Sequence, residues 1–266
     1  MEQVRKALTI AGSDSGGGAG IQADLKTFQE LRVFGMSVVT AVTAQNTLGV
    51  SGVYPIPPEG VAGQMDAIAE DMGTDALKTG MLFSAEIIKV VAEKISRYGW
   101  EKLVVDPVMI AKGGASLLQE EAVAAMKEYL FPLAYLVTPN IPEAEVLTGI
   151  KIHTEQDKKE AARILHSYGI KNVIIKGGHD RDENKARDIL FDGNDFYVFE
   201  SERIHTKNTH GTGCTFSAAI TAELAKGHPV YDAVKTAKQF ITAAIKHELA
   251  IGKGHGPTNH WAYQLK

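Results

Sequence analysis

Short apolar runs alternate along this chain with segments whose apolar residues recur every three or four positions. The runs occupy residues 7–11, 37–43, 76–79, 103–105, 135–138 and 173–175. Each run lies next to a helical segment, which indicates strands connected by helices. This alternation predicts an α/β fold with a mostly parallel central sheet and helices on both of its faces.

The remaining elements complete that arrangement. Helices are expected at residues 61–71, 85–98, 120–130, 144–147, 155–168, 215–226 and 230–249, and from Ile21 onward after the first strand. Around residues 187–200 the pattern changes to two short strands joined by residues 192–195, which predicts a small β hairpin. Because no repeat, linker or low-complexity segment interrupts the chain, residues 1–266 are interpreted as one domain.

Composition excludes several classes of function. The formal net charge is -4, and lysine and arginine are scattered, which disfavours nucleic-acid binding. The single cysteine, Cys214, has no internal disulfide partner, and the sequence contains no run of about 18 apolar residues. We therefore expect a cytoplasmic protein that neither enters a membrane nor binds nucleic acid.

Polar residues directly follow several of the expected strands. Asp14, Asp106, Asn140 and Lys176 each lie just past an apolar run, and glycines 16–18 lie just past the first. In open parallel sheets, ligands bind outside the carboxyl ends of the strands, where loops lead into helices. The sequence therefore predicts a functional cleft along that edge of the sheet.

Residues 209–219 have the composition of an anion site. Gly211 and Gly213 lie directly before an alanine-rich helix. Glycine lets the backbone approach a phosphate closely, and the free amides at a helix N-terminus favour negative charge. In a phosphoryl transfer, such amides would stabilise charge on the transferred group. The alternative interpretation is a tight turn that packs a helix.

Cys214 falls in the first turn of that helix. The helix dipole would lower the pKa of a thiol there, which predicts a reactive thiol. A small buried side chain among alanines is the alternative. Other nucleotide-binding patterns fit poorly: the chain contains no G-x-x-x-x-G-K-[ST], and the G-x-G-x-x-A at residues 18–23 has no acidic residue after the next strand.

Two strand ends carry oxygen ligands of the kind that Mg²⁺ prefers, namely Asp106 and the pair Asn140 and Glu143. On spacing alone, Asn140 and Glu143 equally predict a capping box at a helix start. Lys176 is either a phosphate ligand or a solvated charge at a strand end. No histidines lie four residues apart, which disfavours zinc, and His210 is expected to support or pack against the anion loop.

Taken together, the blocks around these positions resemble the hydroxymethylpyrimidine/phosphomethylpyrimidine kinase family of the ribokinase-like superfamily. The blocks, in family order, are ALTIAGSD (7–14), GGAGIQADLKT (17–27), TAQNT (43–47), KTGM (78–81), DPVM (106–109), TPNIPEA (138–144), KGGH (176–179), NTHGTGCT (208–215) and GHGP (254–257). The resemblance implies a ribokinase-like three-layer α/β sandwich, ATP as phosphoryl donor, Mg²⁺ and a homodimer. It also implies two transfers in thiamine biosynthesis, first to 4-amino-5-hydroxymethyl-2-methylpyrimidine and then to its monophosphate.

The same resemblance assigns roles to individual residues. The substrate pocket would comprise Gln45 at the pyrimidine edge with Gly12, Ala19, Asp24, Met81 and Val108. ATP would be bound by Asn140, Lys176, Thr209 and Gly213, magnesium by Asp106 and Glu143, and the anion hole would be formed by Gly211, Thr212 and Gly213. Cys214 would face the substrate hydroxyl. Residues 45–51, 110–116 and 177–184 are candidate closing loops because of their glycine and polar content.

The role of Cys214 differs between the candidate functions. Related sugar kinases carry an aspartate base at this position, and a thiol is a weaker base unless its pKa falls. The second transfer has an acceptor that is already anionic, so replacing Cys214 with alanine is expected to impair the first transfer more. A pyridoxal kinase, in which the thiolate could add to the aldehyde, is one alternative, possibly alongside the pyrimidine activity. A non-catalytic vitamer-binding protein is the other.

Overall fold

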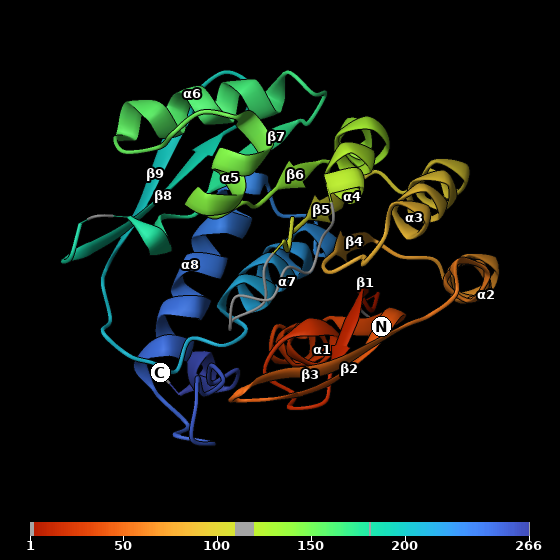
Figure 1. The fold of residues 1–266 in the computed structure, drawn as a ribbon, viewed down its shortest axis with the longest axis horizontal. Coiled ribbons are helices and arrows are strands. Elements are labelled where there is room, and N and C mark those ends of the chain that lie inside the picture. Colours follow the sequence, from red (N-terminus) through yellow and green to blue (C-terminus); the bar gives the residue numbers. More distant parts are fainter. Residues whose placement is uncertain (1–2, 110–119, 181, 266) are drawn as a thin grey trace.

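A nine-stranded sheet runs through the centre of the molecule (Figure 1), in the order β3-β2-β1-β4-β5-β6-β7-β8-β9. The computed structural model describes residues 3–109, 120–180 and 182–265. The strands are β1 (Lys6–Asp14), β2 (Phe34–Asn46), β3 (Gly49–Pro55), β4 (Ala76–Thr79), β5 (Leu103–Val105), β6 (Leu136–Val137), β7 (Asn172–Ile175), β8 (Lys185–Phe191) and β9 (Phe196–Glu202). From β2 to β7 all neighbours are parallel, and β3, β8 and β9 add antiparallel pairs at the two edges.

Helices cover both faces of the sheet, as predicted. They are α1 (Gly20–Glu30), α2 (Pro58–Asp71), α3 (Ala85–Tyr98), α4 (Glu120–Ala125), α5 (Ile141–Thr148), α6 (Glu155–His166), α7 (Thr212–Ala225) and α8 (Val230–Lys246). A π-helical turn, Met126–Leu130, and a 3₁₀ turn, Phe131–Leu133, extend α4, and two more 3₁₀ turns are Gly177–His179 and Ala262–Gln264. None of the helices in the described ranges is long and apolar enough to cross a membrane.

Side-chain alternation along the strands divides the interior into two apolar cores. Leu8 and Ile10 of β1 point into the core that α2 to α6 cover, whereas Ala7 points into the core beneath α1, α7 and α8. This follows from the period of two in a strand, which sends successive side chains to opposite faces. Helix α7 lies at the centre of its layer, because it packs against both α1 and α8 and is almost wholly buried. The result is a three-layer sandwich.

Most differences from the sequence prediction lie at element ends, with one missed strand. Strand β3 was not predicted, because its sequence contains Gly49, Gly52 and Pro55 and it lies half-exposed at the sheet edge without an apolar run. Residues 45–51, expected to be a closing loop, therefore form the tip of the β2–β3 hairpin. The hairpin expected near residues 187–200 is confirmed as β8 and β9.

The C-terminal segment returns to the carboxyl edge of the sheet. The His255 amide donates to the Thr47 carbonyl at 2.8 Å, and Pro257 forms an isolated bridge with His210. These contacts join the chain end to the β2–β3 hairpin and to the loop before α7. The C-terminal segment, the β2–β3 hairpin and the loop before α7 therefore lie together at the carboxyl edge of the sheet.

His260 anchors this segment against α7. Its ring is buried, and Nε2 forms a hydrogen bond of 3.0 Å with the Thr215 hydroxyl. Burial disfavours the charged ring and lowers the pKa of His260 to about 4. Protonating His260 in the folded protein is therefore costly.

The His260→Gln variant tests this consequence. Because the folded-state pKa lies below the ordinary value, the contribution of neutral His260 to stability is present above about pH 6.5 and is lost as the pH falls toward about pH 4. Glutamine can still form a hydrogen bond with Thr215, as donor or acceptor, but does not titrate. Between about pH 7 and about pH 5, urea unfolding should show the wild type losing about 2 kcal/mol more than the variant. Equal losses in the two proteins would contradict this account of His260.

Candidate active site

The carboxyl ends of β1 and β4 meet where the chain changes its direction of travel across the sheet, since β2 lies on one side of β1 and β4 on the other. Such a switch point is where open α/β sheets bind ligands. A cavity of about 930 Å³ opens there, large enough for a nucleotide and a small alcohol together. The predicted cleft is therefore present at the predicted edge.

The structure brings nearly all of the predicted site residues into this cavity. Its lining includes Gly12, Ala19, Gln45, Met81, Asp106, Val108, Asn140, Glu143, Lys176, Thr209, Gly211, Thr212, Gly213 and Cys214. Asp24 does not belong to the lining, and residues 110–116 lie outside the described part of the chain. Of the remaining loop candidates, residues 45–51 contribute Gln45 and Val50 to the lining, and residues 177–184 contribute Gly178 and His179.

Asp14 organises the first glycine loop. It ends β1 and is 3% exposed, with Oδ1 accepting from the Gly16 amide at 2.8 Å. Its Oδ2 accepts from the amides of Gly18 and Ala19, at 3.0 and 2.8 Å. Burial alone would raise the pKa of Asp14, but the hydrogen bonds from His210 and from these amides outweigh it and lower the pKa. A charged carboxylate thus fixes the loop that borders the cavity.

The anion loop lies directly against that glycine loop. Gly211 precedes α7 with φ of 83°, and a Cβ there would fall 1.7 Å from the Gly18 carbonyl oxygen. Only glycine fits, by both conformation and space. No side chain caps α7, and the helix itself offers no acceptor to the amides of Gly213 and Cys214 in its first turn. The helix start therefore presents free amides of the kind that bind anions, and α7 begins at Thr212, three residues before the predicted start.

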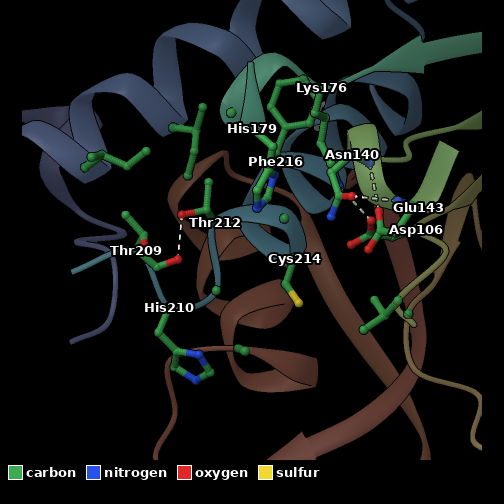
Figure 2. A pocket seen from close by; sticks show the side chains of 18 of the residues that line it. Asp106, Asn140, Glu143, Lys176, His179, Thr209, His210, Thr212, Cys214 and Phe216 are labelled. Carbon is green, nitrogen blue, oxygen red and sulfur yellow. Dashed lines mark hydrogen bonds and ion pairs between the residues drawn. The ribbon is translucent and has the colours of Figure 1, made fainter. Parts of the chain in front are cut away.

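Lys176 and Asp106 form an ion pair beside this helix start (Figure 2). Lys176 Nζ lies 3.1 Å from Asp106 Oδ1, and a Cβ on Gly213 would lie 3.4 Å from the same Nζ. Burial opposes charge on Lys176, but Asp106 and Glu143 nearby raise its pKa. Asp106 in turn has a lowered pKa, because Lys176 and Lys78 outweigh its burial. Both groups are therefore charged in the cavity, and the interpretation of Lys176 as a solvated strand-end charge is wrong.

Asn140 and Glu143 form the capping box of α5. The Asn140 amide donates to Glu143 Oε2 at 2.8 Å, and the Glu143 amide donates to Asn140 Oδ1 at 2.9 Å. Burial raises the pKa of Glu143 to about 7, and the nearby charge of Asp106 acts in the same direction. The capping interpretation is thus confirmed, and it leaves a carboxyl group facing the cavity.

The donor set suits a weakly held magnesium ion. Within residues 3–109, 120–180 and 182–265, no group of three or more His, Cys, Asp or Glu side chains could hold a metal. Mg²⁺ in nucleotide sites commonly uses one or two carboxylates and takes its other ligands from phosphates and water. Asp106 and Glu143 fit that requirement as hard oxygen donors on one side of the cavity (Figure 2).

The prediction of an activated thiol at Cys214 is wrong. The sulfur faces the cavity in Figure 2, but burial raises the pKa of the thiol to about 12. Lys78 nearby acts in the opposite direction and does not compensate. The dipole of α7 is outweighed because a thiolate at this position would be removed from water. Cys214 is therefore a neutral thiol at the cavity wall.

Asp24 is a buried structural partner rather than a substrate ligand, which corrects the sequence prediction. It is fully buried on α1, and its two carboxylate oxygens lie 2.8 and 2.9 Å from Lys78 Nζ. The Thr9 hydroxyl donates to the same carboxylate at 2.6 Å. Lys78 itself lines the cavity beneath Cys214, a position that no sequence argument assigned. A lysine inside the four-residue apolar strand β4 is the signal that could have revealed it.

A three-layer α/β sandwich with an uncapped helix N-terminus and a buried lysine at the switch point is the arrangement that the ribokinase-like resemblance implies. The family model of phosphomethylpyrimidine kinase matches residues 14–259. Over 261 residues the chain is 58% identical to hydroxymethylpyrimidine/phosphomethylpyrimidine kinase of Bacillus subtilis, covering 98% of this chain and 96% of that protein. The chain therefore belongs to the phosphomethylpyrimidine kinase family.

Solved structures of pyridoxal kinases have the same fold. The ADP complex of Bacillus subtilis pyridoxal kinase is similar with a TM-score of 0.92 and 47% identity, covering 99% of this chain and 100% of that one. Pyridoxal kinase from Staphylococcus aureus in complex with AMP-PCP and pyridoxal has a TM-score of 0.91 and 42% identity, covering 98% and 95%. These similarities confirm the ribokinase-like three-layer fold.

The contribution of the buried ion pair between Lys78 and Asp24 can be measured as a change in the free energy of unfolding. Replacing one partner leaves an unpaired buried charge, so Lys78→Met should lower the free energy of unfolding by about 3–5 kcal/mol. The double variant Lys78→Met with Asp24→Leu should recover most of that loss, because no charge then remains unpaired. Lys151→Met, at an exposed pair with Glu145, is the control and should change stability by less than about 1 kcal/mol. A double variant no more stable than Lys78→Met would argue against this account.

Proposed function

We propose that this protein transfers the γ-phosphoryl group of ATP to the hydroxymethyl group of 4-amino-5-hydroxymethyl-2-methylpyrimidine, and then a second phosphoryl group to the resulting monophosphate. The observation that carries the proposal is the uncapped start of α7. It lies in the cavity, beside Lys176 and against the glycine loop of residues 16–18. Membership of the family supports the pyrimidine as acceptor, and the ADP and AMP-PCP complexes of the related kinases support ATP as donor. The product would serve thiamine biosynthesis, as the family resemblance implies.

In this proposal the two ends of the cavity bind the two reactants. All of the residues assigned to the two ends belong to the cavity lining. Gln45 would line the pyrimidine end with Gly12, Ala19, Met81 and Val108, and Thr209, Asn140 and the apolar residues of α8 would line the nucleotide end. The amides of Gly213 and Cys214 and the nearby charge of Lys176 would lie between the two reactants. A phosphoryl group in transit spreads charge over its oxygens, so these groups act chiefly by position and electrostatics.

Magnesium would be held by Asp106 and Glu143 and would neutralise charge on the nucleotide phosphates. Asp106 is suited to this role because its neighbouring lysines keep it ionised. With Cys214 neutral, the first transfer uses no thiolate base. The substrate hydroxyl would instead be positioned against the helix start. Among the charged oxygens, that of Asp106 lies nearest to Gly213 and could accept a hydrogen bond from this hydroxyl.

Pyridoxal phosphorylation is the second candidate, since the similar solved structures are pyridoxal kinases and one contains pyridoxal. A neutral Cys214 removes the thiolate that addition to the aldehyde would require, which favours the pyrimidine. The charged Lys176 and the open helix start argue against a protein that only binds a vitamer. From the family resemblance we also propose a cytoplasmic homodimer.

A two-substrate kinase assay tests the function directly. Purified protein with Mg-ATP should form ADP with the pyrimidine alcohol, and mass spectrometry should detect first the monophosphate and then the diphosphate. Lys176→Met should reduce the rate by about 10²–10³-fold, because a charged donor to the transferred group is lost. Faster turnover of pyridoxal than of the pyrimidine would overturn the choice of substrate. Tight binding of the pyrimidine without ADP formation would indicate the vitamer-binding alternative.

Cys214→Ala separates a neutral thiol from a general base. Loss of a general base costs about 10²–10⁴-fold in rate. Because the pKa of Cys214 is raised to about 12, we expect both transfers to fall by less than about tenfold and by similar factors. This reverses the expectation from sequence that the first transfer would suffer more. A loss of about 10²-fold or more confined to the first transfer would support the hypothesis that Cys214 acts as a thiolate base.

A further inference from the structure

The side chains around Gln45 contain an apparent conflict between hydrogen-bond donors. Gln45 Oε1 lies 3.1 Å from the Thr43 hydroxyl, and that hydroxyl also lies 2.8 Å from the Ser13 carbonyl oxygen. One hydroxyl proton cannot serve both oxygens. Gln45 Nε2 faces another nitrogen, His210 Nε2, at 3.4 Å. The partners of Gln45 therefore decide which way its carboxamide points.

The proton on His210 is fixed by Asp14. His210 Nε2 lies 2.8 Å from Asp14 Oδ2, on the side of the cavity away from Asp106 and Glu143 (Figure 2). The same oxygen accepts from the amides of Gly18 and Ala19, and these contacts lower the pKa of Asp14. An ionised carboxylate only accepts hydrogen bonds, so His210 Nε2 must carry a proton. A protonated ring nitrogen cannot accept from the amide nitrogen of Gln45.

We infer that the Gln45 carboxamide presents Oε1 to His210 and Nε2 to Thr43, and that His210, held by Asp14, determines substrate orientation through it. In this arrangement the single Nε2 proton of His210 goes to Asp14 Oδ2, and the ring N–H faces Gln45 Oε1 in place of a second hydrogen-bond donor. Gln45 Nε2 donates to the Thr43 hydroxyl, which donates to the Ser13 carbonyl, and each proton has an acceptor. The two ends of a carboxamide are nearly equal in size, so their hydrogen-bond partners assign them.

This inference rests on the proposed pyrimidine substrate. A carboxamide in this orientation offers an acceptor on the His210 side and a donor on the Thr43 side. A 4-aminopyrimidine offers the complement along one edge: its amine donates to Oε1 and its neighbouring ring nitrogen accepts from Nε2. The 5-hydroxymethyl group then lies beyond the amine, toward the loop with Gly211 and Cys214. The opposite amide orientation would turn the ring over and direct the hydroxymethyl group away from the anion site.

NMR of the wild-type protein tests the orientation without a substitution. In ¹⁵N-histidine-labelled protein, the imidazole nitrogens of His210, assigned from the backbone, should show a protonated Nε2 near neutral pH. An unprotonated Nε2, with the proton on Nδ1, would overturn the inference, because Gln45 Nε2 could then donate to the ring. This readout requires no turnover, so it judges the inference even if the proposed function fails.

Substrate selectivity tests the consequence for the reaction. We compare kcat/KM for the aminopyrimidine alcohol with that for its analogue lacking the 4-amino group. His210→Phe should lower this ratio by about tenfold, because Oε1 is no longer held toward the amine. In a Gln45→Leu background, His210→Phe should leave the ratio unchanged, as a double-mutant cycle requires for coupled residues. His228→Phe, at the far end of α7, is the matched control and should keep the wild-type ratio.

The outcomes separate the possible explanations. A merely structural role for His210 would lower kcat/KM equally for both acceptors and leave their ratio unchanged, which would overturn the inference. A fall in the ratio that persists in the Gln45→Leu background would also overturn it, because the effect would then not act through the carboxamide. If the wild type forms no ADP with either pyrimidine, the proposed function is contradicted instead. The protonation state of His210 Nε2 would still determine the orientation of the Gln45 carboxamide.

Discussion

The contact between two glycine-containing loops is the constraint on which the rest of the site depends. Gly18 and Gly211 meet through their backbones, at a distance that leaves no room for a side chain on Gly211. The hydrogen bond between His210 and Asp14 joins the same loops through side chains. Because one loop borders the end of the cavity proposed to bind the pyrimidine and the other begins α7, this contact would set the distance between acceptor and transferred phosphate in the proposed reaction.

Buried charge is the second organising feature, and it is almost always paired. Lys78 with Asp24 and Lys176 with Asp106 place two lysines around the start of α7. Removing such charges from water is costly, so their retention in the centre of the protein indicates a role beyond stability. They add positive potential where phosphate charge would gather. They do not ionise Cys214, because the burial of the thiol dominates its pKa.

Much of the architecture could be predicted from local pattern, and errors arose where pattern was weak. The central strands and α3 were located well because their apolar periodicity is strong. Strand β3 was missed because an exposed edge strand with glycines has little such signal. Asp24 was misplaced because its role depends on Lys78, which is 54 residues away and approaches it only in the folded chain. The activated thiol at Cys214 was inferred from the helix dipole, and the raised pKa supports the alternative of a neutral, small side chain instead.

The sequence by itself determined the fold class, the edge of the sheet that carries the site, the anion loop and the family. These features depend on the local spacing of residues and on continuous sequence blocks such as residues 208–215. Only the tertiary structure decided which charges are paired, that the Cys214 thiol is neutral, and that the pKa of Glu143 is raised to about 7. It also decided which side chains surround Gln45 and His210. Protonation and hydrogen-bond direction depend on burial and on partners from distant segments, and those are fixed only when the chain has folded.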